Sequence, residues 1–157
     1  MPPPSRLLPE PARRLAQALL LAAALLAAAP PAPAREPALL ELSSYPRSTL
    51  TIHGGGSGHV IRVWIADTPE RQQQGLMFVR DLPADEGMLF VNRDPRPMSM
   101  WMKNTYIALD MLFIDSRGRI LRIFERTVPQ SLEALGHGEP VRAVLELRGG
   151  EVARRGL

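Results

Sequence analysis

The chain has 157 residues, with 19 basic and 16 acidic side chains, three histidines and no cysteine, and its formal net charge is +3. This length predicts one domain. The lack of cysteine excludes disulfides, thiolate metal sites, iron–sulfur clusters and a thiol nucleophile.

The first 34 residues have the pattern of a secretory signal peptide. Arginines, Arg13-Arg14 among them, precede a largely apolar run from Leu15 to Ala29, and the small-residue sequence Ala32-Pro33-Ala34 follows. The run is shorter than the roughly 20 residues that cross a bilayer, so we expect cleavage before Arg35 and no permanent span in the mature chain. We therefore expect a periplasmic or secreted protein, with the Sec and twin-arginine routes both open.

Cleavage also changes the charge of the protein. The basic residues fall from 19 to 16 and the acidic residues from 16 to 15, so the net charge falls from +3 to +1. This balance does not favour a polyanion, and no helix-turn-helix or RNA-recognition pattern occurs in the sequence. Nucleic acid is not an expected partner, and we expect a monomer.

Residues 35–47 are expected to form a spacer before a single β-rich domain, residues 48–157. Strands are predicted at 48–52 and 60–66, separated by a glycine-rich loop. In the second strand Ile61, Val63 and Ile65 share one face, and Trp64 lies on the other. A short helix should follow from Asp67 to about residue 77, with Asp67 and Glu70 as a capping box, and then a strand at 88–91.

Two hairpins are predicted next. Asn104-Thr105 would join strands 98–103 and 106–111, and a type I turn with a glycine bulge at 115–118 would place Phe113 opposite Leu121. Together they predict a three-stranded meander whose core face carries Met98, Met100 and Met102. The opposite face would carry Ser99, Trp101, Lys103, Asp110 and Arg122.

The remaining segments are a loop at 127–140, a strand at 141–147 and a short helix within 150–156. The fold class is mainly β (α+β), built as an antiparallel meander or a partly closed small barrel with one or two short helices.

Lys103 is the only lysine in the chain, against eighteen arginines. This contrast suggests a place where a compact ammonium fits and a guanidinium does not. Asp110 lies in an apolar strand and would need a cation or several hydrogen bonds if buried. Trp101 offers a surface for stacking a ligand. The ligand-binding residues expected are Trp101, Lys103, Asn104, Asp110 and Arg122.

Other interpretations stay open. A buried Asp110–Lys103 pair would be purely structural, and the same two residues could serve a small hydrolase as acid and base. Met98, Met100 and Met102 could bind Cu(I) through their thioethers, although methionine is also ordinary core filling. The histidines stand far apart, so we expect neither a histidine metal site nor a cofactor.

Several segments resemble the bacterial and archaeal family known as domain of unknown function 192. They are Ile65–Arg71, Gly75–Phe78, Gly87–Phe90, Trp101–Thr105, Leu109–Asp115 and Val141–Leu147. The resemblance implies a mostly antiparallel β domain, often exported, with no established activity or cofactor. Trp101, Lys103, Asn104 and Asp110 match its most recognisable motif. The function expected is a non-catalytic accessory module of the cell envelope that binds a small ligand, a glycan or an envelope protein.

Overall fold

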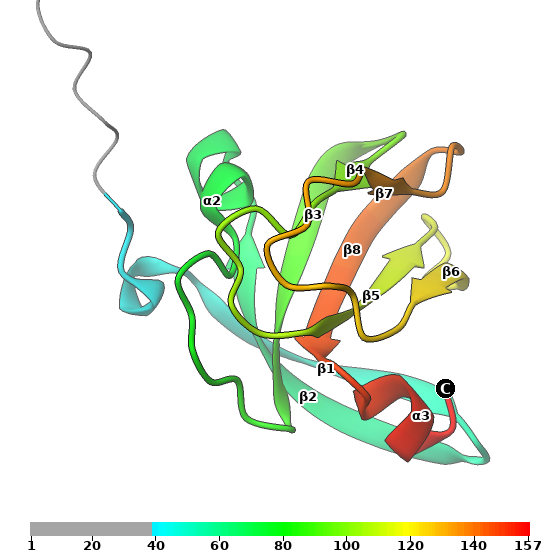
Figure 1. The fold of residues 1–157 in the computed structure, drawn as a ribbon. Coiled ribbons are helices and arrows are strands. Elements are labelled where there is room, and N and C mark those ends of the chain that lie inside the picture. Colours follow the sequence, from blue (N-terminus) through cyan, green and yellow to red (C-terminus); the bar gives the residue numbers. More distant parts are fainter. Residues whose placement is uncertain (1–38) are drawn as a thin grey trace, which may run out of the picture. The chain divides into compact units, whose positions relative to one another are not determined.

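The computed structural model describes residues 39–157, so the predicted signal peptide lies outside the described part of the chain (Figure 1). The elements in chain order are η1 (Leu42–Ser44), β1 (Arg47–Gly54), β2 (Ser57–Ala66), α2 (Pro69–Gln74), β3 (Glu86–Arg96), β4 (Ser99–Met100), β5 (Leu109–Ile114), β6 (Ile120–Phe124), β7 (Leu135–Gly136), β8 (Val141–Arg148) and α3 (Glu151–Arg155). No helix among these residues is long and apolar enough to cross a membrane.

Six strands form one sheet in the order β1-β2-β3-β8-β5-β6, and β4 and β7 form a small second sheet. All strand pairs are antiparallel except β2 and β3, which are parallel. The mainly β fold class is therefore confirmed. The partly closed barrel was wrong, because the sheet is open and the outer strands β1 and β6 do not pair with each other (Figure 1).

α2 provides the crossover that the parallel pair β2–β3 requires. Its N-cap is Thr68, whose hydroxyl accepts a hydrogen bond from the backbone N–H of Arg71 at 3.3 Å. The capping box predicted at Asp67 was wrong by one residue, because the Asp67 carboxylate instead accepts from the Arg71 guanidinium at 2.7 Å. The helix ends at Gln74, and Gly75 follows with φ 52° and ψ −133°, a conformation that favours glycine.

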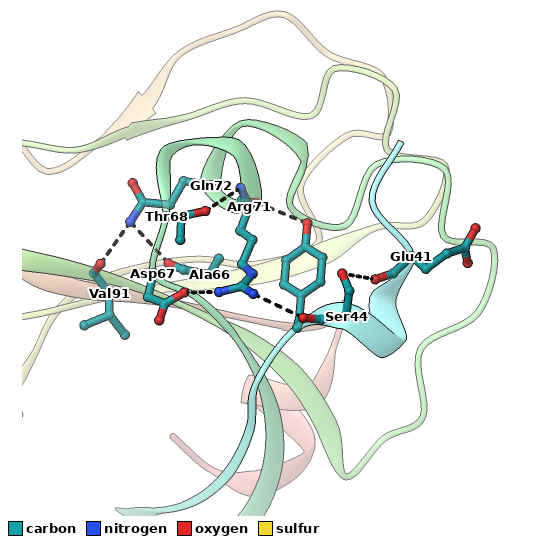
Figure 2. Close-up of polar contacts among 9 residues, drawn as sticks. Glu41, Ser44, Ala66, Asp67, Thr68, Arg71, Gln72 and Val91 are labelled. Atoms are coloured by element: carbon teal, nitrogen blue, oxygen red, sulfur yellow. Dashed lines mark hydrogen bonds and ion pairs between the residues drawn. The ribbon is translucent and has the colours of Figure 1, made fainter. Parts of the chain in front are cut away.

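A side chain of α2 fixes the helix to β2 and β3 (Figure 2). The Gln72 amide donates to the carbonyls of Ala66 at 3.2 Å and Val91 at 2.9 Å, where β2 ends and β3 continues. Arg71 donates to the carbonyl of Ser44 at 3.2 Å. These bonds hold α2 in one position relative to β2 and β3.

Residues 39–46, which the sequence analysis placed in a spacer, contact the domain. The side chain of Tyr45 is buried at 3 % exposure. The backbone N–H and carbonyl of Leu40 both bond to the Gln74 amide at 2.6 Å. This segment therefore packs beside α2.

The first predicted hairpin was wrong. β4 pairs with β7, and β5 pairs with β8 and β6, so strands 98–103 and 106–111 never become neighbours. Residues 101–108 instead form a loop with a turn in which Thr105 N–H donates to the Met102 carbonyl at 3.0 Å. The reason is competition from a distant segment: β8 occupies the edge of β5 that the local hairpin would have used.

The second hairpin is present, with a different register. The turn at 115–118 forms as predicted, and Gly118 has φ 78°. A register shift between Phe113 and Ile114 places Phe113 opposite Arg122 rather than Leu121. From Phe113 back to Met111, each β5 residue therefore pairs with a β6 residue one position later than predicted, as an extra residue in β6 requires.

Apolar side chains cover both faces of the sheet. One core cluster includes Trp64, Met88, Phe90, Met111 and Phe113, together with Met102 from the 101–108 loop. The other cluster is made by Ile52, Ile61, Val63, Leu112, Leu145, Leu147 and Val152. The predicted split of Trp64 from Ile61 and Val63 is confirmed. Met98 and Met100 pack against the first cluster, so all three methionines face the core as expected, although through a different register.

Candidate functional site

A small cavity lies between the end of α2, residues 99–105 and the sheet. Its volume is about 70 Å³, which is room for a few atoms of a ligand or for water molecules. The lining residues on which the following argument depends are Gln73, Phe90, Met100, Trp101, Lys103 and Glu146.

Glu146 is the carboxyl group of this cavity. It lies in β8 between Met88 of β3 and Met111 of β5, its direct cross-strand neighbours. The residue is only 4 % exposed, and its carboxyl accepts no hydrogen bond from any residue in the described part of the chain. Desolvation by burial raises the pKa of Glu146 from 4.5 to about 8. The side chain is therefore a protonated, neutral acid at neutral pH.

Three consecutive glutamines of α2 line the cavity, and they differ in their contacts. Gln72 and Gln74 use their amides to fasten β2, β3 and Leu40, as described above. Gln73 is exposed, and its side-chain amide forms no hydrogen bond with another described residue. Gln73 is thus the α2 side chain that is available to a ligand.

Gly75 lines the cavity beside the Phe90 ring. A Cβ atom at this position would lie 2.8 Å from Cζ of Phe90, closer than real side chains approach. The positive φ of Gly75 turns the chain away from the helix at the same point. Glycine here lets the Phe90 ring pack directly against the end of α2.

Trp101 and Lys103 lie at the rim of the cavity. The Trp101 side chain is 48 % exposed, and the Lys103 ammonium lies 5.1 Å from the centroid of its ring, within the range of a cation–π contact. Lys103 is exposed and forms no ion pair with another residue between 39 and 157. The structure therefore brings these two predicted residues together.

Asn104 shapes the loop behind them. Its φ is 55°, in the left-handed region that asparagine tolerates. Its carbonyl accepts from the Phe78 N–H at 2.9 Å, and its side-chain amide lies 3.9 Å from Sδ of Met77. Asn104 thus joins the 101–108 loop to the segment after α2.

Asp110 lies elsewhere, and its carboxylate has backbone partners. The residue is completely buried. One oxygen accepts from the N–H groups of Arg126 at 2.7 Å and Gly150 at 2.9 Å, and the other from Val152 at 2.8 Å. Asp110 forms no ion pair with Lys103. These bonds fix the first turn of α3, and a buried, saturated carboxylate is not placed to serve a hydrolase.

Arg122 also lies apart from the cavity. Its guanidinium carbon is 4.3 Å from the centroid of the Phe124 ring, and it donates to the Gly136 carbonyl at 3.2 Å. These contacts join β6 to the 127–140 loop. Of the five residues expected from the sequence, Trp101 and Lys103 line the cavity, Asn104 supports it, and Asp110 and Arg122 do not contribute.

A groove of about 350 Å³ adjoins the cavity. The two share Gln72, Gln73, Phe90, Ser99 and Met100, and Met98 lines the groove as well. Met102 does not, since it is fully buried with its Sδ 3.1 Å from the Thr127 hydroxyl. The three thioethers are therefore not presented together to one ligand.

Sequence reasoning missed Glu146, although a signal was present. The segment 141–147 alternates between two buried faces, and Glu146 is the single acid among apolar residues on it. The argument that selected Asp110, an acid within an apolar strand, applies equally to Glu146.

The arrangement is suited to binding. Glu146 is the one carboxyl among residues 39–157 that lines the cavity. Within residues 39–157, no three His, Cys, Asp or Glu side chains lie together as a metal site would need. A neutral acid, an exposed aromatic ring and an amide together can hold a small polar molecule.

The model of the DUF192 family, described as "Uncharacterized ACR", matches residues 50–157. The chain belongs to the DUF192 family. A "putative transcription regulator" from Sinorhizobium meliloti 1021 is 44 % identical, with a TM-score of 0.71 over 73 % of this chain and 89 % of that one. A protein of unknown function from Novosphingobium aromaticivorans is 35 % identical, with a TM-score of 0.72 over 83 % of this chain and 93 % of the other. None of the curated proteins compared matches the sequence.

The segments that resemble the DUF192 family divide into two structural groups. Residues 65–71 form the start of α2, where Arg71 pairs with Asp67, and residues 109–115 carry Asp110, which holds α3. Residues 75–78, 87–90, 101–105 and 141–147 each supply at least one residue to the cavity. Four of the six segments of this DUF192 domain thus meet at one place, although they are distant in the sequence.

Proposed function

We propose that this protein is a non-catalytic accessory module of the cell envelope that binds a small polar ligand in the Glu146 cavity and the adjoining groove. The observation that carries the proposal is the buried carboxyl of Glu146, which lines a cavity and has no partner in the described chain. Because this carboxyl faces the cavity, a ligand with a complementary polar group placed there would form a hydrogen bond with it.

The surface around the cavity supports this role. Five of the seven large apolar residues that are exposed between residues 39 and 157 lie on three segments that contact one another: Phe78, Trp101, Tyr106, Val128 and Leu132. Backbone bonds connect these segments, from Phe78 to Asn104 and from Gln130 to Thr105. Large apolar residues that are exposed on neighbouring segments are typical of a binding surface.

The binding site can be tested by NMR titration of residues 39–157 and of the full chain with amino acids, amino sugars, dipeptides and monosaccharides. We expect a bound compound to shift the indole N–H signal of Trp101. Trp101→Ala should weaken that binding about tenfold or more, because it removes the stacking surface. Val60→Ala is the control, since Val60 is also an exposed apolar residue but lines neither the cavity nor the groove.

If compounds bind with equal strength to wild type and Trp101→Ala, or if none perturbs the cavity residues, the cavity is not a binding site.

The envelope location rests on the pattern of residues 1–34. We expect the protein purified from an envelope fraction to begin at Arg35, as mass spectrometry would show. A chain that retains residues 1–34 and is recovered only with the cytoplasmic fraction would contradict this part of the proposal.

A further inference from the structure

The charge of the ligand can be inferred from the surroundings of Glu146. Met88 and Met111 lie on either side of the carboxyl in the sheet, and Gln73, Phe90 and Met100 line the cavity that it meets. None of these side chains carries a charge, and the one cation among residues 39–157 that lines the cavity, Lys103, lies at its exposed rim over the Trp101 ring. An ionised Glu146 carboxylate has no ion pair with another described residue, and it becomes favourable when a cation with N–H donors enters.

Aromatic and thioether groups in the walls of the cavity favour a cation, and the guanidinium of Arg96, which lines the groove, already donates to Asn92 and Gln72. Trp101 and Phe90 present aromatic rings, whose faces are electronegative, and Met100 contributes a weakly accepting thioether. The ring of Trp101 already lies beneath an ammonium group, that of Lys103, at 5.1 Å. A cationic ligand would therefore find an aromatic surface at the entrance and a carboxyl inside.

The dimensions separate a small head group from a longer body. The cavity of about 70 Å³ can hold an ammonium group and one or two water molecules. The adjoining groove, at about 350 Å³, has room for the rest of a small molecule. Since the cavity and the groove share Gln73, Ser99 and Met100, a single ligand can occupy both.

We propose that the cavity binds the primary ammonium group of a small organic ligand, which forms an ion pair with the Glu146 carboxylate while the body of the ligand lies in the groove. This inference rests on the proposed binding function and names the chemical class of the ligand. When the ligand enters, the Lys103 ammonium leaves its place over the Trp101 ring.

Binding of an ammonium group releases the proton that Glu146 carries in the empty protein. Among residues 39–157, Lys103 is the only other charged or titratable group that lines the cavity, and Arg96 lines the adjoining groove. Met88 and Met111 flank Glu146 in the sheet. Affinity for a cation should therefore rise as the pH increases from 6 to 9, because burial has raised the pKa of Glu146 to about 8. A ligand that accepts a hydrogen bond from the protonated acid would show the opposite trend.

The experiment compares three probes of similar size, butylammonium, butyramide and butyrate, by NMR titration of the full chain at pH 6 and pH 9. We expect butylammonium to shift the signals of Trp101 and Met100, to bind at least about tenfold more tightly at pH 9 than at pH 6, and to lose about tenfold or more in Glu146→Gln. Arg122→Ala, which removes an exposed cation outside the cavity, should leave the titration unchanged.

Two results would overturn the inference. Tighter binding of butyrate or butyramide at the same residues would show that the cavity takes another class of group, and the binding function itself would stand. Butylammonium binding that is equal in wild type and Glu146→Gln, or that leaves the Trp101 and Met100 signals unmoved, would show that no ion pair forms with Glu146. Failure of the wider compound screen, by contrast, is what removes the binding function.

Discussion

Asp110 and Glu146 are two buried carboxyls on adjacent strands, and their surroundings are opposite. Asp110 pairs with Leu147 across β5 and β8, and Met111 pairs with Glu146, so the acids are one register position apart and face opposite sides of the sheet. Three backbone N–H groups donate to Asp110, whereas Glu146 receives no hydrogen bond from a described residue. The comparison shows that burial alone does not distinguish a structural acid from one available to a ligand.

The difference follows from the positions of the two residues along their strands. Asp110 lies near the start of β5, beside the point where the chain leaves β8 and begins α3, and unpaired N–H groups are plentiful at a helix start. Glu146 lies inside β8, where the neighbouring backbone groups already pair with β3 and β5. No backbone donor is left for its carboxyl.

The largest expected effect is on the pH dependence of folding. Because the pKa of Glu146 rises from 4.5 to about 8 in the folded protein, the native state keeps a proton that the unfolded chain has released. Below pH 4.5 this group should not affect the free energy of unfolding. Between pH 4.5 and about 8 the free energy of unfolding should fall by up to about 5 kcal/mol in total, and above pH 8 it should level off. Glu146→Gln should remove that decline, as urea unfolding at pH 4, 6, 8 and 9 would measure.

Glu133→Gln provides the control, because Glu133 is exposed and forms no ion pair within residues 39–157. Parallel stability curves for wild type and Glu146→Gln would mean that Glu146 has an unrecognised partner. The contrast with Asp110 would then disappear.

A smaller effect is expected at Asp110. Asp110→Ala leaves three N–H groups without their acceptor, two of them at the start of α3, and should lower the free energy of unfolding by about 3 to 4 kcal/mol at pH 7. Urea unfolding would measure this loss, with the exposed Asp81→Ala as the control. A loss below about 1 kcal/mol would show that the Asp110 bonds contribute little, and the role assigned to this residue would be wrong.

The smallest effect is expected at the rim. Trp101 and Lys103 are exposed, and their cation–π contact contributes roughly 0.5–1 kcal/mol at such a site. Trp101→Ala and Lys103→Ala should therefore each change the free energy of unfolding by no more than about 1 kcal/mol. Thermal and urea unfolding would test this, and a large loss of stability would identify these residues as structural.

Sequence reasoning located the strands more accurately than their partners. The strands near 48–52, 60–66, 88–91 and 141–147, the 115–118 turn and the final helix all appear in the structure. These are local features, encoded by alternation, turn residues and glycine. The hairpin around Asn104 failed because β8, more than thirty residues further along the chain, pairs with β5 instead. A local pattern carries no information about such a competitor.

Only the local part of the site could be predicted, because local patterns carry no information about distant segments. Trp101 and Lys103 are two residues apart, so their proximity followed from the sequence. Asp110 was paired with them through a strand register that does not form. Glu146 was overlooked, because nothing local connects β8 to the loop around Trp101.

The sequence by itself determined the fold class, the family and the rim of the cavity, since these depend on residue types and short spacings. The tertiary structure alone decided which buried acid is saturated and which is left open. Hydrogen-bond donors reach the Asp110 carboxylate from segments 16 to 42 residues away. Only folding brings these donors to Asp110, and it brings none from residues 39–157 to the carboxyl of Glu146.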